Sequence, residues 1–141
     1  MFKSTKVMQG YEKFLKNPTN NYCRFCKPKK SDIEKIYKHW WVFNLIAPYE
    51  MWDELKVTDH LMVVPKKHYT AVGEAKVEEF IELQSIFLEF EKQNYNIYWR
   101  AQDSCKKSVE HLHIHLIKTD NNEKLKKMSF KLNPYEVKYQ W

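Results

Sequence analysis

Glycine is scarce in this sequence, with only 2 glycines among 141 residues. This scarcity excludes the glycine-rich loops that cradle phosphate groups in several large protein classes. Long apolar runs are also missing, so the sequence predicts neither a signal peptide nor a membrane-spanning helix, and we expect a cytoplasmic protein. The length fits one domain with one core, and a hydrophobic fraction of 43% indicates a packed globule rather than a disordered chain.

Cysteine is sparse as well, and two of the 3 cysteines form the close pair Cys23 and Cys26. In a reducing compartment such a pair indicates metal or redox chemistry more often than a structural disulfide. The spacing is that of a zinc knuckle, and a structural zinc ion needs four ligands. His60 and His111 each begin a predicted strand, and we expect strand ends to gather at one edge of the sheet. The sequence therefore predicts a Cys2His2 site of Cys23, Cys26, His60 and His111, with a pair of metal-free thiols as the alternative.

Charge and periodicity indicate the architecture and the kind of partner. The net charge of +6 suits an anionic partner such as a nucleotide or a nucleic acid, although many basic proteins bind neither. Helical spacing of apolar residues predicts a short amphipathic helix over residues 4–16, with Ser4 as a possible N-cap, and a long helix over 76–94. We expect strands at 33–37, 40–46, 60–64, 95–101 and 111–117, and a long polar and aromatic connection over 47–59.

The long predicted helix carries apolar residues on much of its circumference. We expect one stripe to face the core and a second set to widen it, so that the helix is well buried. The stripe consists of Val77, Phe80, Ile81, Phe87 and Leu88, and the second set of Leu83, Ile86 and Phe90.

Three histidines alternate with apolar residues in the segment His111-Leu112-His113-Ile114-His115-Leu116-Ile117. Successive side chains of a strand point to opposite faces, so the three imidazoles share one face, roughly 6.6 Å apart, while the apolar residues pack on the core. A neutral imidazole is an abundant nucleophile near pH 7. The pattern thus indicates a row of imidazoles along a phosphate-bearing substrate, rather than a surface strand that happens to carry histidines.

This segment resembles the signature of the histidine-triad (HIT) family, in which three histidines alternate with hydrophobic residues. The resemblance covers about residues 22–118. It extends to the strand that begins at His60 and ends in Pro65, to the segment of Asn44 and Pro48, which is similar to the branch acting on diadenosine polyphosphates, and to the optional zinc pair. It implies an α+β HIT-like fold, a meandering antiparallel sheet with one long helix and a short N-terminal helix. We expect a single histidine-triad domain over 1–141, with a core of 22–118, a helix of 4–16 and an aromatic tail of 119–141.

The resemblance also implies a reaction and a set of roles. His113 would attack the α-phosphorus of a nucleotide and form a covalent nucleotidyl-histidine, which water then hydrolyses. His115 would contact the phosphate, and Ser108 would donate a hydroxyl near the leaving group. Asn44 would hold the ribose. Asn96 matches an asparagine on the strand after the long helix.

Departures from the family pattern leave the substrate open. Tyr98, Trp99 and Arg100 replace the usual glycines, and the connection between Pro48 and His60 is longer than in the family. Arg100 is balanced between a phosphate contact and a surface ion pair. The resulting prediction is a nucleotide hydrolase or transferase that binds a purine nucleoside phosphate, with structural Zn²⁺, as a homodimer.

Two further functions compete with this prediction. A non-catalytic nucleotide-binding or regulatory module would keep the pocket without turnover. A zinc-stabilised nucleic-acid-binding protein would fit the basic charge and the aromatic residues. The second is less favoured because the sequence has no separate basic and aromatic element.

Overall fold

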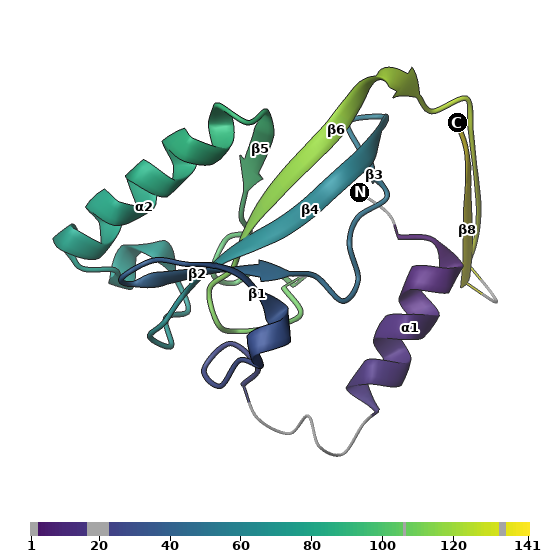
Figure 1. Ribbon diagram of the computed structural model, residues 1–141. Helices are drawn as coiled ribbons and strands as arrows, with labels where there is room; N and C mark the ends of the chain where they lie inside the picture. Colours follow the sequence, from purple (N-terminus) through teal and green to yellow (C-terminus); the bar gives the residue numbers. More distant parts are fainter. Residues whose placement is uncertain (1–2, 17–22, 106, 133–134) are drawn as a thin grey trace.

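The computed structural model describes residues 3–16, 23–105, 107–132 and 135–141 (Figure 1). The two α-helices are α1, Thr5–Leu15, and α2, Val77–Glu91, and two short 3-10 helices span Lys30–Asp32 and Val72–Glu74. The strands are β1 (Ile33–Ile36), β2 (Trp40–Asn44), β3 (Met51–Trp52), β4 (Leu55–Pro65), β5 (Tyr95–Tyr98), β6 (Ile114–Lys124), β7 (Lys127–Leu132) and β8 (Tyr135–Gln140). Tyr22, the first residue of the resemblance, lies outside the described residues.

The main sheet is antiparallel and has the order β1-β2-β4-β6-β5, with β3 paired to β4. The helix α2 covers one face of this sheet (Figure 1). Alternation along β4 and β6 sends Leu61, Val63, Ile114 and Leu116 toward α2, where they form the main core. The opposite face carries the histidines and a smaller apolar cluster of Phe25, Phe43, Met62 and Val64.

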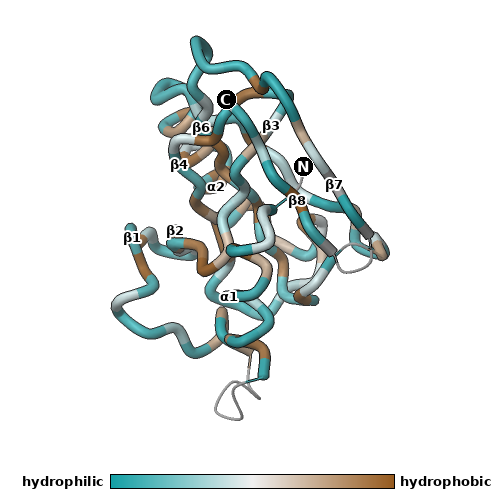
Figure 2. Tube along the Cα trace, turned by 90° about the vertical axis from the view of Figure 1, so that its right-hand side faces the viewer, coloured by the Kyte–Doolittle hydropathy of each residue, from teal (hydrophilic) through white to brown (hydrophobic). Residues whose placement is uncertain are grey.

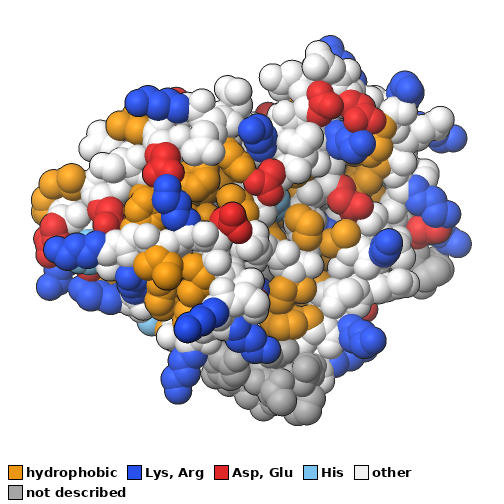
Figure 3. All heavy atoms as spheres, viewed as in Figure 1, with side chains coloured by type: hydrophobic (Ala, Val, Ile, Leu, Met, Phe, Trp, Pro, Cys, Tyr) orange, Lys and Arg blue, Asp and Glu red, His pale blue; other side chains and the backbone are white. Residues whose placement is uncertain are grey.

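The face of α2 that packs on the sheet differs from the predicted stripe. The core side carries Glu79, Leu83, Ile86 and Phe90. The stripe prediction was wrong for most of its members: Val77 is 75% exposed, and Phe80, Ile81 and Leu88 are also exposed. Phe87 packs against the core, and the second set of Leu83, Ile86 and Phe90 is buried as predicted. The physical reason is Glu79, whose carboxylate is buried with hydrogen-bond partners, so that a polar residue occupies a core position that periodicity assigns to the outside. Apolar side chains accordingly reach the surface in the part of the view where α2 lies (Figure 3).

The connection predicted over 47–59 contains a β-hairpin. Asp53 and Glu54 both have positive φ and form the two-residue turn between β3 and β4. Without Asn or Gly in that turn, its sequence gives no hairpin signal. The strand β4 therefore begins at Leu55, five residues before the predicted start at His60.

Segments outside the main sheet form the other flank of the molecule. The hairpin β7–β8 runs beside α1, as the side view shows (Figure 2). The predicted cap is present, since Ser4 Oγ accepts a hydrogen bond from Val7 N at 3.5 Å. The backbone N–H of Val137 donates to Thr5 Oγ1 at 3.1 Å, which ties β8 to α1. Among the described helices, none has the length and apolar character needed to cross a membrane.

Candidate active site and metal site

The histidine row lies where the chain enters β6. His111 and His113 precede the strand and His115 lies within it, and all three are buried. The rings of His113 and His115 are 5.3 Å apart, while Leu112, Ile114 and Leu116 pack in the α2 core. Although β6 begins at Ile114 and not at His111, the predicted division between imidazole face and apolar face is present.

His113 has one nitrogen engaged with the backbone. Its Nδ1 lies 2.9 Å from the carbonyl oxygen of His111. Because a carbonyl only accepts, Nδ1 carries the proton of the neutral ring, and Nε2 keeps its lone pair. Burial lowers the pKa of His113, and the hydrogen bond to His111 only partly offsets this effect. The ring is therefore a neutral imidazole at pH 7, with Nε2 as its nucleophilic atom.

His115 forms a buried pair with His60 that fixes its tautomer. The backbone N–H of Tyr49 donates to His60 Nδ1 at 2.8 Å, so neutral His60 carries its proton on Nε2. That proton is donated to His115 Nδ1 at 2.9 Å, which leaves the proton of His115 on Nε2. Burial lowers the pKa of His60 to about 3 and that of His115 to about 2. The Nε2–H of His115 is thus a hydrogen-bond donor on the face that carries the nucleophile of His113.

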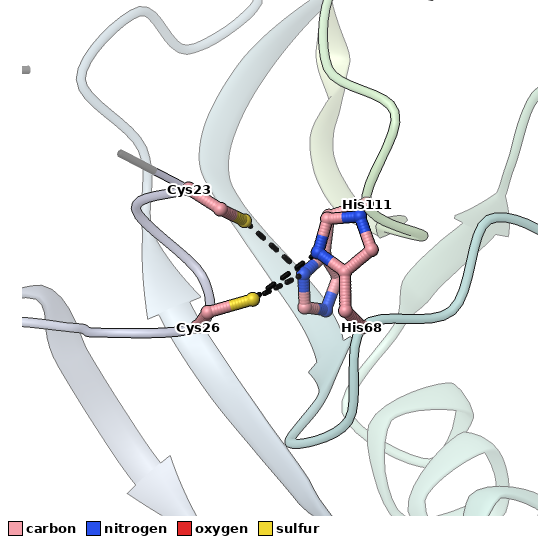
Figure 4. Close-up of side chains that lie close together, drawn as sticks. All are labelled: Cys23, Cys26, His68 and His111. Atoms are coloured by element: carbon pink, nitrogen blue, oxygen red, sulfur yellow. Dashed lines mark hydrogen bonds between the residues drawn. The ribbon is translucent and has the colours of Figure 1, made fainter. Parts of the chain in front are cut away.

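Four side chains converge into a second cluster next to the histidine row (Figure 4). They are Cys23, Cys26, His68 and His111, and their ligand atoms all lie within 4.8 Å of one another. The Nδ1 of His111 lies 3.3 Å from Cys23 Sγ and 3.5 Å from Cys26 Sγ, and His68 Nδ1 lies 3.1 Å from Cys26 Sγ. Tetrahedral zinc would separate a sulfur and a nitrogen ligand by about 3.5 Å.

The tautomer and the thiols also fit a metal ion. His111 Nε2 donates to the carbonyl of Pro65 at 2.9 Å, so the lone pair of Nδ1 points toward the sulfurs, as in a metal-ligating histidine. Burial lowers the pKa of His111 to about 4, which keeps the ring neutral. Burial and the neighbouring Cys23 thiol raise the pKa of Cys26 to about 11. A bound cation would stabilise the thiolate form of Cys26, which burial and the neighbouring thiol disfavour. The group can therefore hold a metal ion.

The prediction of His60 as a ligand of this cluster was wrong. In the antiparallel pair of β4 and β6, His60 lies opposite Ile117, whereas Val63 lies opposite Ile114. The start of one strand therefore lies beside the end of its neighbour, and it is Pro65, at the end of β4, that lies beside His111. His68, three residues beyond Pro65, supplies the fourth ligand atom.

A cleft of about 400 Å³ opens beside His60. Its walls come from the end of β2, the segment after it, the first half of β4 and the C-terminal Trp141. Asn44, the predicted ribose contact, lines this cleft and donates to Glu34 at 3.1 Å. The lining residues are Asn44, Leu45, Pro48, Tyr49, Glu50, Lys56, Val57, Thr58, Asp59, His60 and Trp141.

The other predicted substrate residues lie at different distances from the histidines. Arg100 Nη2 donates to the Tyr49 hydroxyl at 3.4 Å, and the Tyr49 ring is 5.3 Å from His115. Asn96 lies on β5 and donates to the carbonyl of Ile117 at 3.3 Å, with an exposed side chain. Ser108 lies in the segment that leads into His111, and its side chain is exposed. The structure thus brings Arg100 and Asn44 to the edge of the site, while Asn96 is engaged with the backbone.

Three residues at the site went unassigned in the sequence analysis. His68 follows the strand that ends in Pro65, which is a weak indication of a role at the site. Its distance in sequence from Cys23 and Cys26 does not indicate that it lies beside them. Tyr49 contacts both His60 and His115, with ring centroids 4.4 and 5.3 Å away. Lys3 lies over the Tyr49 ring. Nothing in the local sequence of Tyr49 or Lys3 indicates these positions, because they depend on long-range packing.

Comparisons with known proteins agree with this geometry. The model of the HIT domain family matches residues 54–122, which include the histidine row, β4, β5 and most of β6. A search of curated proteins finds no match.

Solved structures share the fold at low sequence identity. A HIT family hydrolase from Legionella pneumophila aligns with a TM-score of 0.54 and 20% identity over 71% of this chain and 95% of the other. A HIT family hydrolase from Clostridium thermocellum aligns with a TM-score of 0.54 and 21% identity over 72% of this chain and 93% of the other. A hypothetical histidine triad nucleotide-binding protein from Sulfolobus tokodaii aligns with a TM-score of 0.56 and 20% identity over 84% of this chain and 81% of the other.

The fold is therefore the HIT-like fold, as predicted. The HIT domain family model matches part of this chain, residues 54–122, and the solved structures share its fold.

Proposed function

We propose that this protein is a nucleotide hydrolase or transferase that releases a nucleoside 5′-monophosphate from a phosphate, amine or dinucleoside polyphosphate through a nucleotidyl-His113 intermediate. The observation that carries the proposal is the hydrogen bond from His113 Nδ1 to the His111 carbonyl, which leaves Nε2 as a neutral nucleophile. HIT family hydrolases share the fold, and one relative is described as nucleotide-binding.

In the first step, Nε2 of His113 attacks the α-phosphorus, and a P–N bond forms as the bond to the leaving group breaks. The leaving group departs with the electron pair and takes up a proton, for which the Ser108 hydroxyl is the candidate donor. The Nε2–H of His115 donates to the phosphate oxygen on which charge develops. In the second step, water attacks phosphorus, the P–N bond breaks, and the nucleoside monophosphate leaves with His113 restored. The proton that water gives up returns to Ser108.

Substrate positioning falls to the residues around the row. Asn44 in the cleft is the candidate for the ribose, and Arg100 is the candidate for a phosphate. Asn96 would join them after exchanging its backbone contact for substrate. His60 is a positioning residue in this scheme, because it sets the tautomer of His115 without touching substrate.

The metal in this proposal is structural zinc, held by Cys23, Cys26, His68 and His111. Two thiolates and two imidazoles form a donor set that suits zinc. The ion would fix the segment of His111 against the loop of His68, and it takes no part in the steps above. We also propose that this protein belongs to the branch that acts on diadenosine polyphosphates.

We also propose that the partner chain is a second copy of this protein. The exposed apolar face of α2 consists of Val77, Phe80, Ile81 and Leu88. An exposed apolar face on an otherwise charged surface favours a contact with the same face of a second copy.

The substitution His113→Ala tests the mechanism. Turnover of adenylated and guanylated substrates should fall by several orders of magnitude, while nucleotide binding survives, because a covalent nucleophile is removed and the pocket is kept. Radiolabel trapped from α-labelled nucleotide should be acid-labile and should disappear in the variant. His39→Ala, which changes a histidine outside the row, is the matched control.

Two results would count against the proposal. Unchanged turnover in His113→Ala would refute the assignment of the nucleophile. Tight nucleotide binding by the parent without turnover or label would replace the enzyme with a non-catalytic nucleotide-binding module.

A further inference from the structure

The N-terminal segment crosses the aromatic wall of the histidine site. Its path is fixed at two points: the backbone N–H of Ser4 donates to the Glu50 carboxylate, and Thr5 Oγ1 accepts from Val137 N at 3.1 Å. Glu50 follows Tyr49 directly. These contacts hold Lys3 next to Tyr49 instead of leaving it in open solvent.

Lys3 is a half-buried cation close to the imidazoles. Its Nζ lies 5.5 Å from the ring centroid of Tyr49, and that ring is 4.4 Å from the His60 ring and 5.3 Å from the His115 ring. Among the described residues, no carboxylate forms an ion pair with Lys3. Burial, and then the charge of Arg100, lower the pKa of Lys3. An ammonium group that is partly removed from water and has no counter-ion is costly, and an anionic ligand would offset that cost.

Arg100 approaches the same tyrosine from its hydroxyl end. Its guanidinium donates to the Tyr49 hydroxyl at 3.4 Å and lies 5.7 Å from the ring centroid of Tyr98. The Tyr98 ring is 6.0 Å from that of His115. Tyr49 therefore lies between two cations, each one aromatic ring away from His115.

The electrostatic field beside His115 is positive, because Lys3 lies over the Tyr49 ring and Arg100 lies at the Tyr49 hydroxyl and beside the Tyr98 ring. Both rings lie next to the His115 imidazole. A nucleoside phosphate with one or two negative charges would leave part of this field uncompensated. A chain of phosphates carries the larger charge that matches it.

We propose that Lys3 and Arg100 form a cationic rim that binds phosphate groups beyond the one attacked by His113, so that the protein prefers substrates with a polyphosphate chain to those with an amine leaving group. This inference rests on the proposed function and narrows its substrate class. Lys3 lies outside residues 54–122, the part matched by the HIT domain family. Arg100 lies within the matched part, so Lys3 is the charge that the N-terminal segment adds to the rim.

The test compares two substrates that give the same adenylyl intermediate. Diadenosine tetraphosphate has a polyphosphate leaving group, and adenosine 5′-phosphoramidate has ammonia. For Lys3→Gln we expect the ratio of kcat/KM for the tetraphosphate to that for the phosphoramidate to fall roughly tenfold, the effect of losing one charge-assisted contact. Arg100→Gln should lower the ratio in the same direction. Lys6→Gln removes the same charge from an exposed site on α1 and should leave the ratio unchanged.

A binding measurement separates this inference from the proposed function. Calorimetric titration with inorganic tripolyphosphate at low salt should give a dissociation constant roughly tenfold higher for Lys3→Gln than for the parent, with a shallower dependence on salt. If neither substrate turns over and no label forms, the proposed function fails, and the tripolyphosphate titration still decides the rim. An unchanged substrate ratio in Lys3→Gln, or equal tripolyphosphate affinity in parent and variant, would overturn the inference.

Discussion

Glu79 is a buried carboxylate that ties the long helix to the loop of the metal site. Its side chain is only 3% exposed. It accepts hydrogen bonds from Lys67 Nζ at 2.6 Å, the Tyr69 hydroxyl at 2.7 Å and the backbone N–H of Lys76 at 2.9 Å. Lys67 and Tyr69 flank His68 in sequence, so Glu79→Gln perturbs both the core and the loop that carries a candidate ligand.

The expected loss of stability follows from these contacts. The glutamine amide keeps the shape and one acceptor oxygen, which can still serve Tyr69 and Lys76. It loses the charge-assisted bond to Lys67, which regains water because its side chain is 54% exposed. The cost is therefore that of one such bond, about 2 kcal/mol. For a chain of this length, that loss corresponds to a fall in melting temperature of roughly 6 °C.

The pH dependence gives a second, independent signature. The Lys67 hydrogen bond, as the largest cause, lowers the pKa of Glu79 from 4.5 to about 2. A carboxylate with a depressed pKa in the folded state contributes stability above the unfolded pKa, and that stability is lost as pH falls through the folded pKa. The parent should therefore lose its advantage over Glu79→Gln between pH 4.5 and about 2.

The assay is urea unfolding followed by circular dichroism at several pH values. Glu78→Gln, an exposed neighbour on the first turn of α2, is the matched control and should unfold like the parent at pH 7. Equal midpoints for Glu78→Gln and Glu79→Gln would refute the role of the buried carboxylate. A difference between parent and Glu79→Gln that stays constant down to pH 2 would refute the linkage argument.

Two further predictions concern the metal and the assembly. Purified protein should contain about one equivalent of zinc per chain. His68→Ala should lose the zinc and melt at a lower temperature, whereas His60→Ala should retain the zinc. Equal zinc content in the two variants would contradict the ligand set. Light scattering should give a mass twice the 17.3 kDa of the chain, and Phe80→Glu on the exposed face of α2 should halve it; a monomeric parent at micromolar concentration would rule the homodimer out.

The sequence was sufficient for the parts of the site that depend on local periodicity. The two-residue repeat of His111, His113 and His115 predicted a shared imidazole face, because alternation in a strand requires no knowledge of its neighbours. The same holds for the Ser4 cap and for the existence of α2. On α2 the second set of Leu83, Ile86 and Phe90 was predicted correctly, but the main stripe was placed on the wrong face. Glu79 shares the buried face and is tolerated there through Lys67 and Tyr69, which local periodicity does not reveal.

Features that depend on strand register were beyond local sequence reasoning. The assignment of His60 to the metal assumed that both histidines begin neighbouring strands at the same edge. An antiparallel pair reverses one strand, so the residue beside His111 comes from the end of β4, and His68 follows from there. The placement of Lys3 depends on contacts between residues far apart in sequence, such as that of Ser4 with Glu50, which are 46 residues apart.

The corrected ligand set joins the metal cluster to the nucleophile through one residue. The imidazole of His111 belongs to the cluster, and its backbone carbonyl accepts the Nδ1 proton of His113. A metal ion bound at His111 would therefore fix the carbonyl that selects the tautomer of His113. His60 lies away from the metal cluster and determines the tautomer of His115, because the Tyr49 N–H fixes the proton of His60 on Nε2. In each of the two imidazoles proposed to contact the phosphate, a hydrogen bond at Nδ1 therefore determines the state of Nε2. Nε2 of His113 carries a lone pair, and Nε2 of His115 carries a proton. This opposite setting of the two tautomers is what attack on phosphorus and stabilisation of its oxygen would require of adjacent histidines.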